Sequence, residues 1–461
     1  MISNQSIILL LYLVTIVCFI LALRFLSSPK RARHGNWVGG AGMIIAVATT
    51  LLIEGIGNWA LIVVGGLIGS AVGVVGARRV KMTAMPQMVA LFNGVGGGAA
   101  ALVALAEWHN AVDPAAKHTV SIVLSALIGS ISFAGSLVAF AKLQELVSGR
   151  PIVFPAQNVV DILVFLAAAG FGIAAIAGAQ EQWVLVAVIL LSLLFGVMFV
   201  LPIGGADMPV VISLLNAFTG VAASATGFVL NNTVLIVAGM LVGASGTLLT
   251  LLMAKAMNRS ITNVVFGAFG QVQAGAGEGR TDDGRTMRAT TPQDVAVQLS
   301  FARKVIVVPG YGMAVAQAQH DVRQLAEVLE ERGVDVKYAI HPVAGRMPGH
   351  MNVLLAEANV PYTQLFEMDQ INPEFPQTDV ALVIGANDVT NPAARSDRSS
   401  PIYGMPILDV DKAASIVVLK RSMRPGFAGI DNELYLDPKT TMLFGDAKDS
   451  VLKLIAAVKA L

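Results

Sequence analysis

Cysteine is the scarcest residue of this 461-residue chain, which contains only Cys18. A single cysteine excludes an internal disulfide framework and a cysteine-based metal site. Charge is also scarce, because 13% of the residues are charged whereas an average soluble protein has roughly 25%. The net charge of +1 gives no reason to expect a nucleic acid as a partner. We therefore expect no metal site and no nucleic-acid partner.

The few charged residues are unevenly distributed. Residues 1–257 carry 18 of the 61 Asp, Glu, Lys and Arg residues, and residues 258–461 carry the other 43. This difference predicts a membrane region followed by a region in water. The six histidines are expected in loops or in the polar region: His34, His109, His118, His320, His341 and His350. A proton path through the membrane region would then have no imidazole of its own.

Nine apolar runs are present, and a membrane-spanning helix needs about 20 such residues. They lie near residues 6–26, 37–53, 59–77, 86–106, 119–141, 159–178, 183–201, 209–229 and 233–254. Basic residues follow the first, third, fifth and ninth runs, whereas the loops after the even-numbered runs hold only Lys117. The positive-inside rule therefore predicts an outside N-terminus and a cytoplasmic C-terminal region. The many glycines of the runs predict closely packed helices.

Three polar residues lie in or beside these runs, where polar groups are costly and are functional candidates by default. Asn93 is near the middle of the fourth run, and Asn216 lies within the eighth. Asp207 is the only charged residue in the loop before the eighth run. Each also has a purely structural explanation, because Asn can hydrogen-bond two helices together and Asp can cap a helix. The residues alone leave both explanations open.

The polar region predicts a soluble α/β domain. Residues 258–290 are expected to form a linker, and Thr291 is expected to cap a short helix. Short β-branched runs then alternate with helices, which is typical of a doubly wound, Rossmann-like parallel sheet. The predicted strands are 304–309, 334–340, 362–367, 380–385, 414–419 and 441–444, and the main predicted helices are 312–332, 349–358 and 446–460. The predicted domains are thus 1–257, a linker at 258–290, and 291–461.

Glycine-rich and basic loops follow several of these strands, at the sheet edge where such folds bind ligands. Gly310 and Gly312 resemble part of a dinucleotide-binding fingerprint, whose third glycine position is Val315. The second strand ends at His341 without the acid that holds the ribose of NAD, whereas Lys420 and Arg421 offer two cations. These features favour NADP, with its additional 2′-phosphate, over NAD.

Several motifs together resemble the beta subunit of proton-translocating NAD(P) transhydrogenase over the whole chain. They include G-G-A-D-M-P-V-V at 204–211, P-G-Y-G-M-A-V-A-Q at 309–317, V-I-G-A-N-D-V-T at 383–390 and M-L-F-G-D-A-K at 442–448. The resemblance implies hydride transfer between NADH on a separate alpha subunit and NADP⁺ on this chain, coupled to proton translocation. It also implies a bacterial inner membrane location, an alpha subunit with further membrane helices, and a homodimer of the beta chain.

The resemblance also assigns site residues. The implied dinucleotide contacts are Gly310, Tyr311, Gly312, Met313, Ala314, Val315, Val343, Ala344, Gly345, Arg346, Met347, Pro348, Gly349, Gly385, Ala386, Asn387, Asp388, Lys420, Arg421, Ser422, Gly426, Phe427, Ala428, Gly429, Gly445, Asp446 and Ala447. Lys420, Arg421 and Ser422 would hold the 2′-phosphate, 426–429 would form a lid, and Asp388 is a candidate sensor of protonation or redox state. The implied proton-path and coupling residues are Asn93, Asp207, Asn216, Ser245, Gly246 and Arg259.

Two residues depart from the family's pattern. Many relatives have a proton-carrying histidine where this chain has Asn93, and Asn cannot titrate near neutral pH. Either a partner helix supplies the titrating group, or water and Asp207 carry the proton, and we favour the partner helix. Phe427 stands where relatives often have tyrosine in the lid.

Two other classes of protein were weighed against this interpretation. A channel or transporter with a nucleotide-sensing domain would be expected to show a selectivity filter, or an acid at the end of the second strand. The sequence has neither feature. A reductase that is merely anchored to the membrane does not need nine spans.

Overall fold

The computed structural model of this protein describes residues 4–28, 31–53, 56–110, 116–148, 152–204, 207–256, 287–345, 349–398, 400, 402–423 and 430–461. Some predicted site residues lie outside the described residues: Arg259, Arg346, Met347, Pro348, Gly426, Phe427, Ala428 and Gly429. Most of the predicted linker also lies outside them. The chain divides into two compact units, Met1–Ile203 with Val211–Thr250, and Gly204–Val210 with Leu251–Leu461.

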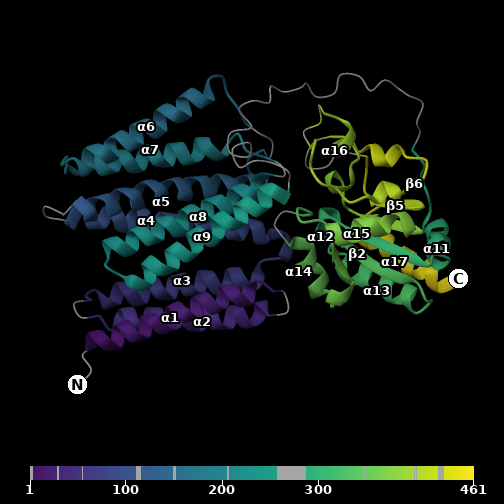
Figure 1. Cartoon of the computed structure of the whole chain (residues 1–461), viewed down its shortest axis with the longest axis horizontal. Coiled ribbons are helices and arrows are strands. Elements are labelled where there is room, and N and C mark those ends of the chain that lie inside the picture. The colour runs from purple at the N-terminus through teal and green to yellow at the C-terminus, as the bar shows by residue number, and fades with distance from the viewer. Residues whose placement is uncertain are drawn as a thin grey trace. The chain divides into compact units, whose positions relative to one another are not determined.

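The first region is built from long helices that run side by side (Figure 1). They are α1 (Asn4–Leu26), α2 (Ala32–Leu51), α3 (Trp59–Arg79), α4 (Met85–Asn110), α5 (Ala116–Leu143), α6 (Gln157–Ile176), α7 (Gln182–Val200), α8 (Met208–Val229) and α9 (Thr233–Ala256), with a 3-10 turn η1 (Met82–Ala84) before α4. Each predicted span coincides with one of these helices.

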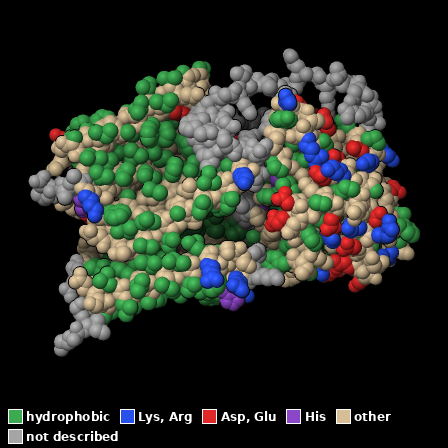
Figure 2. All heavy atoms as spheres, viewed as in Figure 1, with side chains coloured by type: hydrophobic (Ala, Val, Ile, Leu, Met, Phe, Trp, Pro, Cys, Tyr) green, Lys and Arg blue, Asp and Glu red, His purple; other side chains and the backbone are tan. Residues whose placement is uncertain are grey.

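Eight of these helices are long and apolar enough to cross a membrane, within the part of the chain that the structure describes. The exception is α2, whose first turns carry Arg33, His34 and Asn36. Figure 2 shows one face of the molecule, on which the side chains of the helical region are mostly apolar and those of the C-terminal region include many charged ones. The predicted loop positions of three histidines were wrong, because His34, His109 and His118 lie in the end turns of helices.

Glycines bring some of these helices into close contact. A Cβ atom at Gly97 of α4 would lie 2.8 Å from the carbonyl oxygen of Gly129 of α5, and one at Gly239 of α9 would lie 2.4 Å from the nitrogen of Ser224 of α8. Side chains there would force the helices apart. On α3, by contrast, nothing described lies within 4 Å of a Cβ placed on Gly65, Gly66, Gly69 or Gly73. The close packing predicted for these α3 glycines is therefore not seen against any residue that the structure describes.

The C-terminal region contains a six-stranded sheet in the order β3-β2-β1-β4-β5-β6, with every neighbouring pair parallel. The strands are β1 (Lys304–Pro309), β2 (Asp335–Ile340), β3 (Leu365–Glu367), β4 (Val380–Ile384), β5 (Ser415–Lys420) and β6 (Thr440–Phe444). This is the order of a Rossmann-type fold, and its crossing point lies between β1 and β4. All side chains of β4 are buried, as expected for a parallel strand covered on both faces.

Helices and short turns connect the strands (Figure 1). The helices are α11 (Pro292–Ser300), α12 (Tyr311–Ala316), α13 (Gln319–Glu330), α14 (His350–Glu357), α15 (Met368–Ile371), α16 (Ala393–Ser396) and α17 (Ala447–Ala460). The 3-10 turns are η4 (Tyr362–Gln364), η5 (Asn372–Gln377), η6 (Asp388–Thr390), η7 (Val410–Lys412) and η8 (Glu433–Leu436). As predicted, Thr291 caps α11, since its hydroxyl accepts a hydrogen bond from the nitrogen of Asp294.

Two predictions about this region were wrong in detail. The helix predicted over 312–332 is interrupted, because Gln317 adopts a left-handed conformation (φ 52°) and the nitrogen of Ala318 donates to the carbonyl of Met313. The chain therefore forms α12 and α13. The end of the predicted linker is also ordered, since the carbonyl of Arg288 and the nitrogen of Thr290 pair with Met442 of the edge strand β6. An edge strand offers unpaired backbone groups for such an addition.

Candidate nucleotide site

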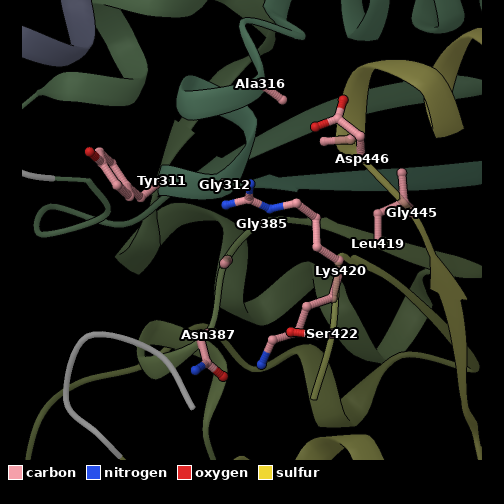
Figure 3. Close-up of a pocket in the computed structure, with 13 residues that line it drawn as sticks. Tyr311, Gly312, Ala316, Gly385, Asn387, Leu419, Lys420, Ser422, Gly445 and Asp446 are labelled. Atoms are coloured by element: carbon pink, nitrogen blue, oxygen red, sulfur yellow. The ribbon is translucent and has the colours of Figure 1, made fainter. Parts of the chain in front are cut away.

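A cavity of about 550 Å³ lies at the carboxyl ends of β1, β4, β5 and β6 (Figure 3). In Figure 3, Tyr311, Gly312 and Gly385 lie on one side, Gly445 and Asp446 on the other, and Lys420 and Ser422 between them. The described residues that line it are Tyr311, Gly312, Ala316, Gly385, Ala386, Asn387, Leu419, Lys420, Arg421, Ser422, Gly445, Asp446 and Ala447. Four of the predicted loops thus contribute to a single cavity.

The glycines of the first loop allow two loops to touch. The nitrogen of Gly310 donates to the carbonyl of Ile384 and that of Gly312 donates to Gly385, both at 2.9 Å. A Cβ at Gly310 would lie 2.3 Å from the Cα of Ala386, and one at Gly385 would lie 2.4 Å from the Cα of Gly312. Gly385 also has a φ of +67°, which favours glycine. These glycines hold the β1 and β4 loops together, and all three of their amides have acceptors, since the nitrogen of Gly385 donates to the carbonyl of Leu419 at 3.3 Å.

Other residues of the predicted site lie elsewhere. Met313 and Ala314 are fully buried, and neither they nor Val315 line the cavity. Within the loop after β2, none of the described residues Val343, Ala344, Gly345 and Gly349 lines it. Val343 instead packs against two buried apolar clusters. The cavity therefore extends from β1 toward β6, away from β2.

His341 anchors the loop after β2. Its Nε2 bonds the carbonyl of Pro406 at 2.8 Å, and its Nδ1 accepts from the nitrogen of Val343 at 3.2 Å. Burial lowers the pKa of His341 to about 4, although the bond to Pro406 opposes this shift. The imidazole is therefore neutral at pH 7, with its proton on Nε2.

The end of β5 carries the cations of the site. Lys420 places its ammonium 4.6 Å from the ring centre of Tyr435, and Arg421 lines the cavity. Burial lowers the pKa of Lys420, and the carboxylates of Asp388 and Asp431 oppose this shift. Asp446, at the far wall, caps α17 by accepting a hydrogen bond from the nitrogen of Lys448 at 3.0 Å.

Asn387 carries an unused buried donor in the cavity wall. Its Oδ1 accepts hydrogen bonds from the Tyr435 hydroxyl at 2.6 Å and from Nδ2 of Asn432 at 3.3 Å. Its Nδ2 is buried and has no acceptor among the described residues. A buried polar atom without a partner is uncommon in a native protein and is expected where a ligand completes the bond. The cavity, its cations and this amide fit a phosphorylated nucleotide.

The predicted membrane residues occupy different surroundings. Asn93 is buried, and its Nδ2 donates to the hydroxyls of Ser136 at 2.9 Å and Ser132 at 3.3 Å. The Ser132 hydroxyl in turn donates to the carbonyl of Leu215 on α8 at 2.9 Å and bonds the hydroxyl of Thr219. A line of hydrogen bonds therefore connects α4, α5 and α8.

The remaining candidates lie on or beside α8 and α9. Asn216 is exposed in this chain, and Asp207 is half-buried directly before α8. Ser245 bonds the carbonyl of Val242 within its own helix. Gly246 packs against α8, where a Cβ would lie 3.1 Å from the Cα of Ala217.

The sequence argument missed Lys142, which is 3% exposed near the end of α5. Its ammonium donates to the carbonyls of Val200 at 3.3 Å and Ile203 at 2.7 Å, and also to that of Leu201. Lys142 therefore holds the C-terminal end of α7, just before the loop that contains Asp207. The available signal was a lysine directly after the predicted span 119–141, where it served only the prediction of membrane orientation.

Known proteins resemble this chain over almost its whole length. Residues 8–457 match the family model described as NAD(P) transhydrogenase beta subunit. Two relatives from Rhodospirillum rubrum, both named NAD(P) transhydrogenase subunit beta, are each 50% identical over 455 residues. The match covers 97% of this chain and 98% of each relative.

Proposed function

This chain belongs to the NAD(P) transhydrogenase beta subunit family, and on that premise we propose that it binds NADP(H) in the cavity at the ends of β1, β4, β5 and β6. The proposed reaction is hydride transfer from NADH, held by a separate alpha subunit, to NADP⁺ held here. When bound, NADP⁺ accepts the hydride on its nicotinamide ring. The position of Lys420 and Arg421 on the cavity wall is the observation that carries this proposal.

The two cations account for the choice of nucleotide. A 2′-phosphate adds negative charge to the nucleotide. Lys420 and Arg421 can bind it with charged hydrogen-bond donors, and Ser422 can bind it with a neutral one. No acid follows β2, where NAD-binding enzymes place one for the ribose. The phosphate-bearing ribose is therefore proposed to lie over β5, on the opposite side of β1 from β2.

The domain needs to hold and orient the dinucleotide, and none of its groups has to act as an acid or base on the ring. The contact between the β1 and β4 loops fixes one wall through Gly310, Gly312 and Gly385. The described residues contain no group of three or more His, Cys, Asp or Glu side chains that could hold a metal ion. Positioning and electrostatics are therefore the proposed contribution of this chain. Of the remaining contacts proposed from the family, 343–349 and the lid 426–429 include residues outside the described part.

We propose that hydride transfer is coupled to proton translocation through the helical region. Asn93 cannot carry a proton, but its buried Oδ1 receives no hydrogen bond from the described residues. It can therefore accept one from water or from a partner helix. The exposed amide of Asn216 on α8 supports a partner helix at this point, because an exposed polar side chain is costly in lipid.

The proposed coupling runs from Asp207 and α8 to α9, through Ser245, Gly246 and Arg259. The close approach of Gly246 to Ala217 supports movement of α8 and α9 as one element. The proposed setting is a bacterial inner membrane with the N-terminus outside and the NADP(H) domain, from residue 291, in the cytoplasm. An alpha subunit and a second copy of this chain would complete the enzyme.

Calorimetry on the full chain in detergent would test the nucleotide proposal. We expect NADPH to bind far more tightly than NADH, and Lys420→Ala/Arg421→Ala to weaken NADPH binding about 100-fold or more. Lys453→Ala/Lys459→Ala, which removes two exposed lysines from α17, is the charge-matched control and should bind like the wild type. Equal affinity for NADH would contradict the proposal and favour a nucleotide-sensing domain on a channel or transporter.

A further inference from the structure

Tyr435 of η8 lies outside every sequence motif of the site, yet it touches two of the cavity's polar residues. The side chain is 2% exposed. Its hydroxyl donates to Oδ1 of Asn387 at 2.6 Å, with a longer contact of 3.4 Å to the carbonyl of Ala386. Its ring lies 4.6 Å from the ammonium of Lys420. One side chain thus joins the β4 loop to the cation at the end of β5.

Hydrogen bonds from the backbone determine which way the Asn387 amide faces. The nitrogen of Leu434 donates to Oδ1 of Asn432 at 3.0 Å, so the other end of the Asn432 amide must be its Nδ2 donor. That Nδ2 lies 2.9 Å from the carbonyl of Asn387 and 3.3 Å from its Oδ1. The Nδ2 donor of Asn432 therefore favours the acceptor oxygen of the Asn387 amide, rather than its nitrogen, on the facing side.

The Tyr435 hydroxyl adds a second donor to the same oxygen. Burial raises the pKa of Tyr435, so the hydroxyl stays protonated at neutral pH. A reversed Asn387 amide would oppose donor to donor at the Asn432 contact, and it would leave the Tyr435 hydroxyl only the longer, 3.4 Å contact to the carbonyl of Ala386 for its hydrogen. The Nδ2 group is therefore left for whatever enters the cavity that Asn387 lines (Figure 3), because no described residue accepts from it.

We propose that Tyr435 and Asn432 are positioning residues of the nucleotide site. The Tyr435 hydroxyl and the Asn432 amide hold Asn387 so that its Nδ2 donates to an acceptor oxygen of bound NADP(H). The Tyr435 ring separately seats the ammonium of Lys420 by a cation–π contact. This inference rests on the proposed function. It gives Tyr435 two roles, since the hydroxyl acts through Asn387 and the ring acts through Lys420.

The two roles can be separated by substitution in the full chain, with NADPH and NADH binding measured by calorimetry. Tyr435→Phe removes the hydroxyl and keeps the ring, so we expect the Kd for NADPH to rise about fivefold without loss of the preference over NADH. Tyr435→Leu also removes the ring, and we expect this preference to fall as well. Tyr362→Phe, at a partly exposed tyrosine of η4, is the control and should leave both affinities unchanged.

A double-mutant cycle distinguishes positioning from a general structural effect. If Tyr435 acts through Asn387, Tyr435→Phe should raise the Kd in the wild type and add nothing in an Asn387→Ala background. Asn432→Asp keeps the acceptor for the Leu434 nitrogen but replaces the Nδ2 donor to the backbone carbonyl and the Oδ1 of Asn387, so it should also raise the Kd. This variant tests the inference if Tyr435→Phe fails to fold.

The outcomes separate the two proposals. Independent, additive effects of Tyr435→Phe and Asn387→Ala would overturn the positioning role, as would an unchanged Kd in Tyr435→Phe. In either case the loss of binding in Lys420→Ala/Arg421→Ala would leave the nucleotide proposal standing. Failure of the wild-type chain to bind NADPH would overturn both.

Discussion

Glycine serves different ends in the two regions of this molecule. In the helical region, Gly97, Gly129 and Gly239 bring helix backbones into contact, where lipid supplies no hydrophobic drive for association. In the α/β domain, Gly310, Gly312 and Gly385 bring two loops into contact at the sheet edge. The first use closes space between elements. The second leaves a cavity beside the contact.

Polar groups are also satisfied differently. In the helical region some side chains bond to backbone carbonyls near the ends of other helices, as Lys142 does at the end of α7 and Gln87 does with Leu143. In the α/β domain, Asn387, Asn432 and Tyr435 bond one another and leave a donor over. Both regions also keep buried atoms without a partner among the described residues, the Oδ1 of Asn93 in the helices and the Nδ2 of Asn387 at the cavity.

The largest expected effect is at Gly385. Gly385→Ala should destabilise the α/β domain by about 3 kcal/mol or more, because it combines a positive φ with a clash against backbone, and NADPH binding should be lost. Gly333→Ala is the matched control, since Gly333 has a φ of +86° but open space around it, and it should cost about 1 kcal/mol. Chemical unfolding checks both. Equal costs would show that the contact between the loops does not matter.

The second largest effect is expected in the helical region, at the lysine that bonds the end of α7. Lys142→Met should cost about 2–3 kcal/mol, because the carbonyls of Val200, Leu201 and Ile203 lose their shared donor. Unfolding of the chain in mixed detergent micelles measures this loss. Lys255→Met, at an exposed lysine near the end of α9, is the control and should change little. An intact wild-type stability in Lys142→Met would mean that other donors replace the ammonium.

His341 should give the α/β domain a stability that depends on pH. The folded pKa of His341 is about 4, below the usual value of 6.5, so the unfolded chain binds the proton first as the pH falls. Stability should therefore drop between pH 7 and pH 5, by about 2 kcal/mol at pH 5 from this residue. His341→Gln, which keeps a donor for Pro406, should flatten that slope, and His320→Gln at an exposed histidine serves as the control. An unchanged slope in His341→Gln would contradict the buried, neutral state.

The smallest effect is expected on α3. Gly69→Ala should change the stability of the isolated chain by less than about 0.5 kcal/mol, because no described atom beyond its own helical turn lies within 4 Å of a Cβ at this position. Gly97→Ala, in a helix of similar glycine content, should cost about 1–3 kcal/mol through the contact with Gly129. Both are measured by unfolding in detergent. A large loss in Gly69→Ala would show that α3 is packed within the chain after all.

The strand assignment followed from the sequence with errors of a few residues, as β1 illustrates: it spans Lys304–Pro309 as predicted. Short β-branched runs are interpretable because each is bounded by glycine or polar residues. The break between α12 and α13 could not be predicted from the sequence, since it depends on the left-handed conformation of Gln317 in a pattern that is otherwise helical. Local preference alone does not reveal such a turn in a residue other than glycine.

Part of the candidate site could likewise be predicted from the sequence, and part could not. Loops such as Gly385–Asn387 and Lys420–Ser422 could be predicted to meet, because the carboxyl ends of parallel strands share one edge. The sequence by itself thus determined the division into an apolar and a polar region, the sheet, and the edge where we propose that a ligand binds, all of which depend on local composition and periodicity. The tertiary structure decided which half of that edge is hollow, that Lys142 holds the end of α7, and that Tyr435 faces Asn387. These contacts join residues distant in the chain, and no local pattern encodes the direction in which a distant side chain will point.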